Sequence, residues 1–220
     1  MKRWGLIACL MLLLLPLCLF AEAVGDWNAA YGDWKIVGDR LVQQSTVAGM
    51  AQATMGVAQS GVIQYEFDAR PIAGYLDQYA GFGVHIGIDR PYGGKSWGNG
   101  KSFLLWLTYD PKAYGGLGVY AQAYKSFSHS RMELVHKGDA YAIPSQYLQQ
   151  VDISRLDRYV LPVKIVVDYD TGLVKVYDPT RENYYYKFSL GGPLSRGGYV
   201  GLRTKSLAAS FGNLKVTRLR

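Results

Sequence analysis

Two acidic residues, Glu66 and Asp68, stand two positions apart in a segment whose polar and apolar residues alternate. Side chains at this spacing lie on one face of a β-strand. Two carboxylates roughly 5–5.5 Å apart can hydrolyse a glycosidic bond, because one attacks the sugar while the other protonates the leaving oxygen. Arg70 and Pro71 follow directly, and no further acid completes the set. We therefore favour solvated carboxylates on an outer face. The alternative is a glycan-processing hydrolase centred on Glu66, Asp68 or His85.

The histidines and cysteines of the chain do not indicate a catalytic site. The three histidines, His85, His129 and His136, form no His-x-x-x-His pair, so no zinc site is expected. Both cysteines, Cys9 and Cys18, lie in an N-terminal segment that we expect to be removed. A non-catalytic function is therefore favoured, with no cofactor.

A long glycine-rich connection, residues 89–101, combines flat aromatic rings with short polar side chains. Sugar rings expose apolar C–H patches surrounded by hydroxyls, so aromatic faces bind the patches while polar side chains hydrogen-bond the hydroxyls. Loops on a rigid scaffold often carry function. We expect Trp97 and Tyr92 to stack on a sugar, and Asp89, Asn99 and His85 to orient its hydroxyls. The alternative is that Trp97 folds back and caps the edge of the fold.

The segment before this loop carries three glycines, Gly81, Gly83 and Gly87, on the same strand face as His85. Glycines weaken a strand, so several on one face indicate that something approaches the backbone closely. That neighbour is either a ligand in a concave groove or a packed segment such as residues 140–150.

Period-two alternation recurs along most of the chain and predicts half-buried strands. In residues 62–69, Ile63, Tyr65, Phe67 and Ala69 share one face and are expected to be buried. Asp170 and Gly172 predict a tight hairpin between strands 163–168 and 173–177. The other expected strands cover residues 32–43, 81–89, 102–109, 117–126, 131–136, 184–190, 199–204 and 214–219, with a helical turn at 145–150 or 153–157. The pattern predicts an all-β fold in which two antiparallel sheets pack face to face.

Residues 1–23 have the features of a signal peptide: a basic start, an apolar stretch too short to span a bilayer, and Ala21-Glu22-Ala23 as a cleavage site. Residues 24–220 are expected to form one cysteine-free exported domain without a transmembrane segment, in the periplasm or at the cell surface. Cleavage removes two basic residues and one acidic residue, so the net charge falls from +7 to +6. The positive residues are scattered, which argues against nucleic-acid binding and favours mild attraction to anionic envelope polymers.

Three motifs carry a resemblance to a known superfamily: residues 32–43 near the start, residues 162–177, and the closing pair of residues 198–204 and 211–216. Together they resemble concanavalin A-like lectin/glucanase domains, particularly laminin-G-like and 3-keto-disaccharide-hydrolase-like bacterial domains, over residues 26–220. The resemblance implies a jelly-roll β-sandwich.

The chain departs from the pattern of this superfamily at several positions. Its glucanases carry Glu-x-Asp-x-x-Glu, whereas here Pro71 occupies the place of the third acid. Gly212 replaces an acidic residue of the closing motif, which puts a calcium site in doubt. Asp178-Pro179 ends the late hairpin, where Asp-Gly is usual. The leading hypothesis is therefore a non-catalytic, lectin-like protein of the bacterial envelope that binds a glycan or envelope polysaccharide. The rival is a structural protein that binds an envelope protein through Tyr75, Tyr79 and Tyr114, since tyrosines dominate many interfaces.

Overall fold

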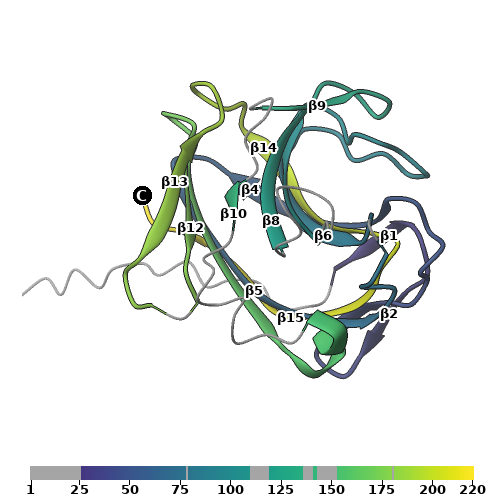
Figure 1. Cartoon of the computed structure of the whole chain (residues 1–220). Coiled ribbons are helices and arrows are strands. Elements are labelled where there is room, and N and C mark those ends of the chain that lie inside the picture. Colours follow the sequence, from purple (N-terminus) through teal and green to yellow (C-terminus); the bar gives the residue numbers. More distant parts are fainter. Residues whose placement is uncertain (1–25, 78, 110–118, 136–140, 143–152, 180) are drawn as a thin grey trace, which may run out of the picture.

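The computed structural model describes residues 26–220, except 78, 110–118, 136–140, 143–152 and 180. The expected signal peptide (residues 1–23), Tyr114, His136 and the helical turn predicted at 145–150 lie outside the described residues. Two antiparallel sheets pack against each other as separate layers, as Figure 1 shows. The prediction of an all-β sandwich is therefore confirmed. Within the described ranges, no helix is long and apolar enough to cross a membrane.

Sheet A has eight strands and sheet B has seven. The order in sheet A is β1 (Asn28–Tyr31), β4 (Ala51–Gln59), β14 (Gly197–Lys205), β6 (Gly81–Ile88), β7 (Ser102–Tyr109), β8 (Val119–Ser126) and β10 (Tyr141–Ala142), and β9 (Met132–Leu134) also pairs with β8. The order in sheet B is β13 (Tyr185–Ser189), β12 (Leu173–Tyr177), β11 (Leu161–Asp168), β5 (Val62–Ala73), β15 (Ala208–Arg218), β3 (Arg40–Gln43) and β2 (Trp34–Val37). A short 3₁₀ turn, η2 (Ile153–Arg158), confirms the helical turn expected there.

The core lies between the sheets and follows the predicted alternation. Ile63, Tyr65, Phe67 and Ala69 of β5 are all buried, as expected, while Gln64, Glu66 and Asp68 point outward. Phe211 of β15 lies within ring-contact distance of Trp34, Phe67 and Phe82, with centroids 5.8–6.3 Å apart. Because Phe82 belongs to sheet A and the other rings to sheet B, this cluster joins the two layers.

The hairpin between β11 and β12 forms as predicted. Asp168 pairs with Leu173 across the turn, and the Asp168 carboxylate accepts hydrogen bonds from the backbone N–H groups of Asp170 (2.9 Å) and Thr171 (3.3 Å). Gly172 has a φ of +72°, a left-handed conformation that favours glycine. Local turn chemistry thus determines this register.

Three strands were missed by the sequence analysis: β1, β4 and the two-residue strand β10. β4 lies between β1 and β14, and its residues are mostly alanine, glutamine, threonine and glycine. Small and polar side chains give little period-two contrast, and here the side chains on both faces of its first half are buried. Tertiary packing rather than local pattern therefore makes β4 a strand.

For two of the three β6 glycines, Gly81 and Gly83, a close neighbour is a side chain of the adjacent strand, whereas Gly87 has a φ of +64° and faces Tyr169. A Cβ atom on Gly81 would lie 2.6 Å from Cζ2 of Trp106, and one on Gly83 would lie 3.0 Å from Cε3 of the same ring. Trp106 of β7 therefore covers these glycines and fills the space that the sequence analysis left to a ligand or to residues 140–150. Apart from the short strand β10, that segment is outside the described residues.

Gly83→Ala should lower the free energy of unfolding by about 1–3 kcal/mol, because its Cβ would press on the Trp106 ring and the carbonyl oxygen of Leu105. Gly198→Ala is the matched control, since a Cβ there meets nothing within 4 Å. Urea unfolding of both variants measures the difference. Equal stability of the two would contradict this account of the β6 glycines.

Candidate functional site

The loop between β6 and β7 packs onto the outer face of sheet A instead of projecting from it. A small second core lies on this face and contains Met50, Leu104, Trp106 and Met132, with Tyr124 packed against it. β6 is consequently buried on both faces over its whole length. The outer face of sheet A around β6 is thus covered by protein, where the sequence alone left room for an open groove.

Arg203 of β14 fixes the loop to the sheet. Its side chain is 0% exposed, and its guanidinium donates hydrogen bonds to the carbonyl oxygens of Ser96 (2.6 Å), Trp97 (2.9 Å) and Met50 (3.4 Å). Burial lowers the pKa of Arg203 to about 9, which leaves it protonated at neutral pH. A buried charge must be compensated by polar partners, so these carbonyl groups are held where the cation needs them.

His85 of β6 is also 0% exposed and lies beside Arg203. The hydroxyl of Ser102 donates to the carbonyl oxygen of Asn99 (2.7 Å), so it accepts a hydrogen bond from Nε2–H of His85 (2.8 Å). Nδ1 then carries the lone pair that faces Nη1 of Arg203 at 3.5 Å. Burial and, secondarily, the Arg203 charge lower the pKa of His85 well below its ordinary value. His85 is therefore a neutral Nε2–H tautomer that supports the loop.

Three more polar side chains close the loop on itself. Gln52 donates to the carbonyl oxygens of Tyr92 (2.8 Å) and Gly94 (2.9 Å), and the side-chain oxygen of Asn99 accepts from the N–H of Tyr92 (2.8 Å). Asp89 Oδ1 accepts from the backbone N–H groups of Arg90 (2.7 Å) and Lys101 (2.8 Å) and so joins the two ends of the loop. The loop is rigid because its backbone is hydrogen-bonded to buried or anchored groups.

Two predicted ligand contacts are revised by this arrangement. His85 and Asn99 are buried, so we assign them to positioning the loop and no longer to contact with sugar hydroxyls. Asp89 remains exposed, and at least one of its carboxylate oxygens holds the loop ends. The sequence analysis did not identify Arg203 and Gln52 as residues that anchor the loop. The available signal was a charged and a polar side chain on strands whose other side chains are mostly small.

The aromatic residues of the loop do reach the surface. Trp97 is 41% exposed and Tyr92 is 40% exposed. The indole N–H of Trp97 donates to the carbonyl oxygen of Met132 (3.3 Å), which fixes the ring, while Tyr92 stacks on His129 with centroids 4.6 Å apart. Trp97 therefore neither folds completely inward nor moves freely.

A cation lies between Trp97 and a second exposed ring. Nζ of Lys205, at the end of β14, is 5.6 Å from the Trp97 ring and 4.8 Å from the ring of Tyr79, which is 57% exposed. We call Tyr79, Trp97 and Lys205 the Trp97 surface. It combines two aromatic rings with one flexible hydrogen-bond donor.

Residues 94–98 have the spacing Gly-x-Ser-x-Gly, which in α/β-hydrolases places a nucleophilic serine on a strand-to-helix turn. Here the segment joins two β-strands. Ser96 is buried, its hydroxyl donates to the side chain of Gln52 (3.4 Å), and its carbonyl accepts from Arg203. His85 is paired with Ser102 instead. The spacing thus serves the loop anchor, without the serine–histidine contact that activates a nucleophile.

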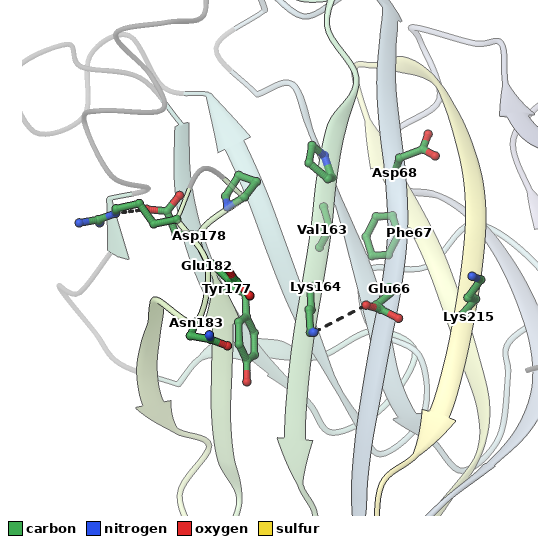
Figure 2. Close-up of a pocket in the computed structure, with 13 residues that line it drawn as sticks. Glu66, Phe67, Asp68, Val163, Lys164, Tyr177, Asp178, Glu182, Asn183 and Lys215 are labelled. Atoms are coloured by element: carbon green, nitrogen blue, oxygen red, sulfur yellow. Dashed lines mark hydrogen bonds and ion pairs between the residues drawn. The ribbon is translucent and has the colours of Figure 1, made fainter. Parts of the chain in front are cut away.

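The outer face of sheet B carries a groove of about 710 Å³ that contains the paired carboxylates of β5 (Figure 2). Glu66 lies 3.8 Å from Nζ of Lys164, and Asp68 lies 2.5 Å from Nη2 of Arg40. Both acids do share the outer face, as expected, and both are ion-paired. Among the described residues, no group of three His, Cys, Asp or Glu side chains is placed to hold a metal ion.

Gly212 lies directly beside the ion pair between Arg40 and Asp68. The Arg40 guanidinium passes over Gly212 to reach Asp68 and Ser210, and a Cβ on Gly212 would collide with it. The glycine that departs from the superfamily motif thus makes room for the arginine. A carboxylate supplied by β5, rather than by residue 212, faces this position.

No protein-family model matches the chain, and no curated protein sequence matches it. Several solved structures are similar. The carbohydrate-binding module CBM66 from Bacillus subtilis aligns over 87% of this chain and 95% of its own, with 15% identity and a TM-score of 0.57. A legume lectin-like domain from Entamoeba histolytica covers 89% and 91%, with 7% identity and a TM-score of 0.55.

Two further structures extend the range of similar proteins. The exoplasmic/lumenal domain of VIP36, in a Ca²⁺-bound form, covers 88% of this chain and 84% of its own, with 12% identity and a TM-score of 0.53. A functionally unknown protein from Saccharomyces cerevisiae covers 89% and 97%, with 9% identity and a TM-score of 0.53. At these identities the matches show the fold alone. The chain has the concanavalin A-like β-sandwich fold, as the resemblance implied.

The environment of His85 predicts how stability changes with pH. Its pKa is lowered in the folded state, so below an unfolded-state pKa of about 6.5 the unfolded chain binds a proton that the folded protein excludes. The His85 contribution to stability is therefore complete above about pH 6.5 and decreases as pH falls toward the folded-state pKa. The decrease should approach about 1.4 kcal/mol per pH unit within that window.

Denaturant unfolding of the wild type and of His85→Gln, from pH 7 to pH 5, measures this contribution. The variant should show a flatter pH profile, whereas His129→Gln, at an exposed histidine, should retain the wild-type slope. Parallel profiles for all three proteins would show that His85 is not the group responsible.

Proposed function

We propose that this protein binds carbohydrate without catalysis, through the Trp97 surface, in which the loop between β6 and β7 supplies Trp97. The carrying observation is that Trp97 is 41% exposed yet fixed at three points: its indole N–H donates to the carbonyl oxygen of Met132, and Arg203 donates to the backbone carbonyl oxygens of Trp97 and of the preceding residue, Ser96. An exposed aromatic ring held in place loses little freedom when a ligand stacks on it, which favours binding.

The neighbouring groups suit a hydroxylated ligand. Tyr79 offers a second ring near the first, and Lys205 Nζ, close to both rings, can donate to a sugar hydroxyl. Tyr92 offers another exposed ring, five residues before Trp97 in the loop between β6 and β7, and its ring stacks on His129. The protein would thus use its rings for C–H faces and the lysine for orientation.

The fold supports this proposal as an analogy only, because concanavalin A-like sandwiches host several functions. One similar structure is described as a carbohydrate-binding module and another as a legume lectin-like domain. We further propose an exported, lectin-like protein of the bacterial envelope, related to the laminin-G-like or 3-keto-disaccharide-hydrolase-like branch. This part follows from the N-terminal segment and the strand motifs of the sequence.

Trp97→Ala should weaken glycan binding at least about tenfold, equivalent to about 1.4 kcal/mol, because it removes the stacking surface. The measurement is a glycan array that includes peptidoglycan fragments and lipopolysaccharide, followed by calorimetry on the best ligand. Tyr199→Ala is the control, since Tyr199 is a similarly exposed ring at the other end of β14.

Unchanged affinity in Trp97→Ala would place the glycan site elsewhere. A blank array, together with stoichiometric capture of an envelope protein, would favour the rival protein-binding function. Folding of each variant is checked by its thermal unfolding midpoint.

A further inference from the structure

The outer face of sheet B carries two pairs of like side chains at its β13 edge. Lys175 of β12 lies directly opposite Lys187 of β13, and Tyr177 lies opposite Tyr185. The two tyrosine rings are 5.4 Å apart. Nζ of Lys175 is 4.5 Å from the Tyr185 ring, and Nζ of Lys164 on β11 is 4.9 Å from the Tyr177 ring. We call these five residues the lysine–tyrosine face.

The Tyr177–Tyr185 pair and the lysine–ring contacts contribute some folding stability, but that stability gives no reason for placing Lys175 opposite Lys187. Like charges directly opposite each other on antiparallel strands are destabilising. A lysine on an edge strand can prevent aggregation, which accounts for Lys187 because β13 is the edge of sheet B. The same reason does not apply to Lys175, because β12 is paired on both sides. Nor does it explain Tyr185, whose ring is left 37% exposed.

The lysine–tyrosine face continues into the groove on the same sheet. Figure 2 shows Tyr177, Lys164, Glu66 and Lys215 in a row across four strands. The register places Glu66 opposite both Lys164 and Lys215. The lysine–tyrosine face and the groove therefore form one continuous surface across β15, β5, β11, β12 and β13.

The acids in the groove are mostly neutralised by the protein itself. Asp68 is paired with Arg40, Asp178 with Arg181 at 2.7 Å, and Glu66 with Lys164. In the part of the chain that the structure describes, no ion pair engages Lys175, Lys187 or Lys215. The surface thus offers three cations without a carboxylate, and Glu182 is the remaining acid lining the groove.

We propose that the lysine–tyrosine face and its groove form a second binding site, for an acidic polysaccharide whose sugar rings carry carboxylates. The lysines pair with the carboxylates, and the Tyr177 and Tyr185 rings contact the C–H faces of the sugars. A neutral glycan would leave the opposed lysines unpaired, whereas a polyphosphate chain has no ring to contact the tyrosines. The site is on sheet B, whereas the Trp97 surface is on sheet A, so this inference does not depend on the function proposed for Trp97.

The probe is polygalacturonate, titrated into the full-length protein at low and moderate salt. The double variant Lys175→Gln/Lys187→Gln should bind at least tenfold more weakly, and Tyr185→Ala should also weaken binding. The matched control is Lys35→Gln/Arg196→Gln, which removes the same charge from exposed positions elsewhere. The control should stay within about twofold of the wild type, and so should Trp97→Ala.

The lysine double variant removes both the repulsion between opposed charges and the contact of Lys175 with the Tyr185 ring, and its thermal unfolding midpoint is measured to show that it is folded. Lys175→Arg/Lys187→Arg should retain binding. The proposal is overturned if wild type does not bind polygalacturonate, or if both charge-reduced variants lose equal affinity, which would indicate net charge alone. It is also overturned if inorganic polyphosphate binds as tightly and Tyr185→Ala changes nothing.

Discussion

The guanidinium of Arg203 is buried. The segments that cover the outer face of sheet A around it are held in place by hydrogen bonds to this cation. A charge in this position is tolerated only where polar groups surround it, and here backbone carbonyls from two loops supply them. Those carbonyls belong to residues that precede β4 and to the loop between β6 and β7. The cation therefore determines where Trp97 stands, although it is distant from Trp97 in sequence.

The neutral imidazole of His85 belongs to the same arrangement. Beside a buried cation, a protonated histidine would add a second charge, and none of the described residues places a carboxylate against it, so the desolvated neutral form is the stable one. Its hydrogen bond to Ser102 extends the network to the end of the loop. A residue that resembled a ligand contact is thus part of the support behind the surface.

The two outer faces of the sandwich have different physical characters. On sheet A, a tryptophan over two glycines and a small apolar cluster exclude water, and the exposed aromatic rings Trp97 and Tyr92 lie on the covering loop. On sheet B, the outward side chains are charged or aromatic and remain partly hydrated. The same fold therefore presents a rigid aromatic edge on one side and a broad polar platform on the other.

Strands β5 and β6 and the β11–β12 hairpin could be predicted from the sequence, because alternation and turn residues act locally. It also identified Trp97 and Tyr92 as surface aromatics on a loop. The sequence did not indicate β4, because its small side chains give no alternating pattern. This segment forms a strand by pairing with β1 and β14. Long-range packing buries Arg203 and leaves Lys205, two residues along the same strand, half-exposed beside the Trp97 ring. Equally, Arg40 finds Asp68 across Gly212 because folding brings β3, β15 and β5 together. Period and spacing assign a residue to a face, but what covers that face depends on segments distant in the chain.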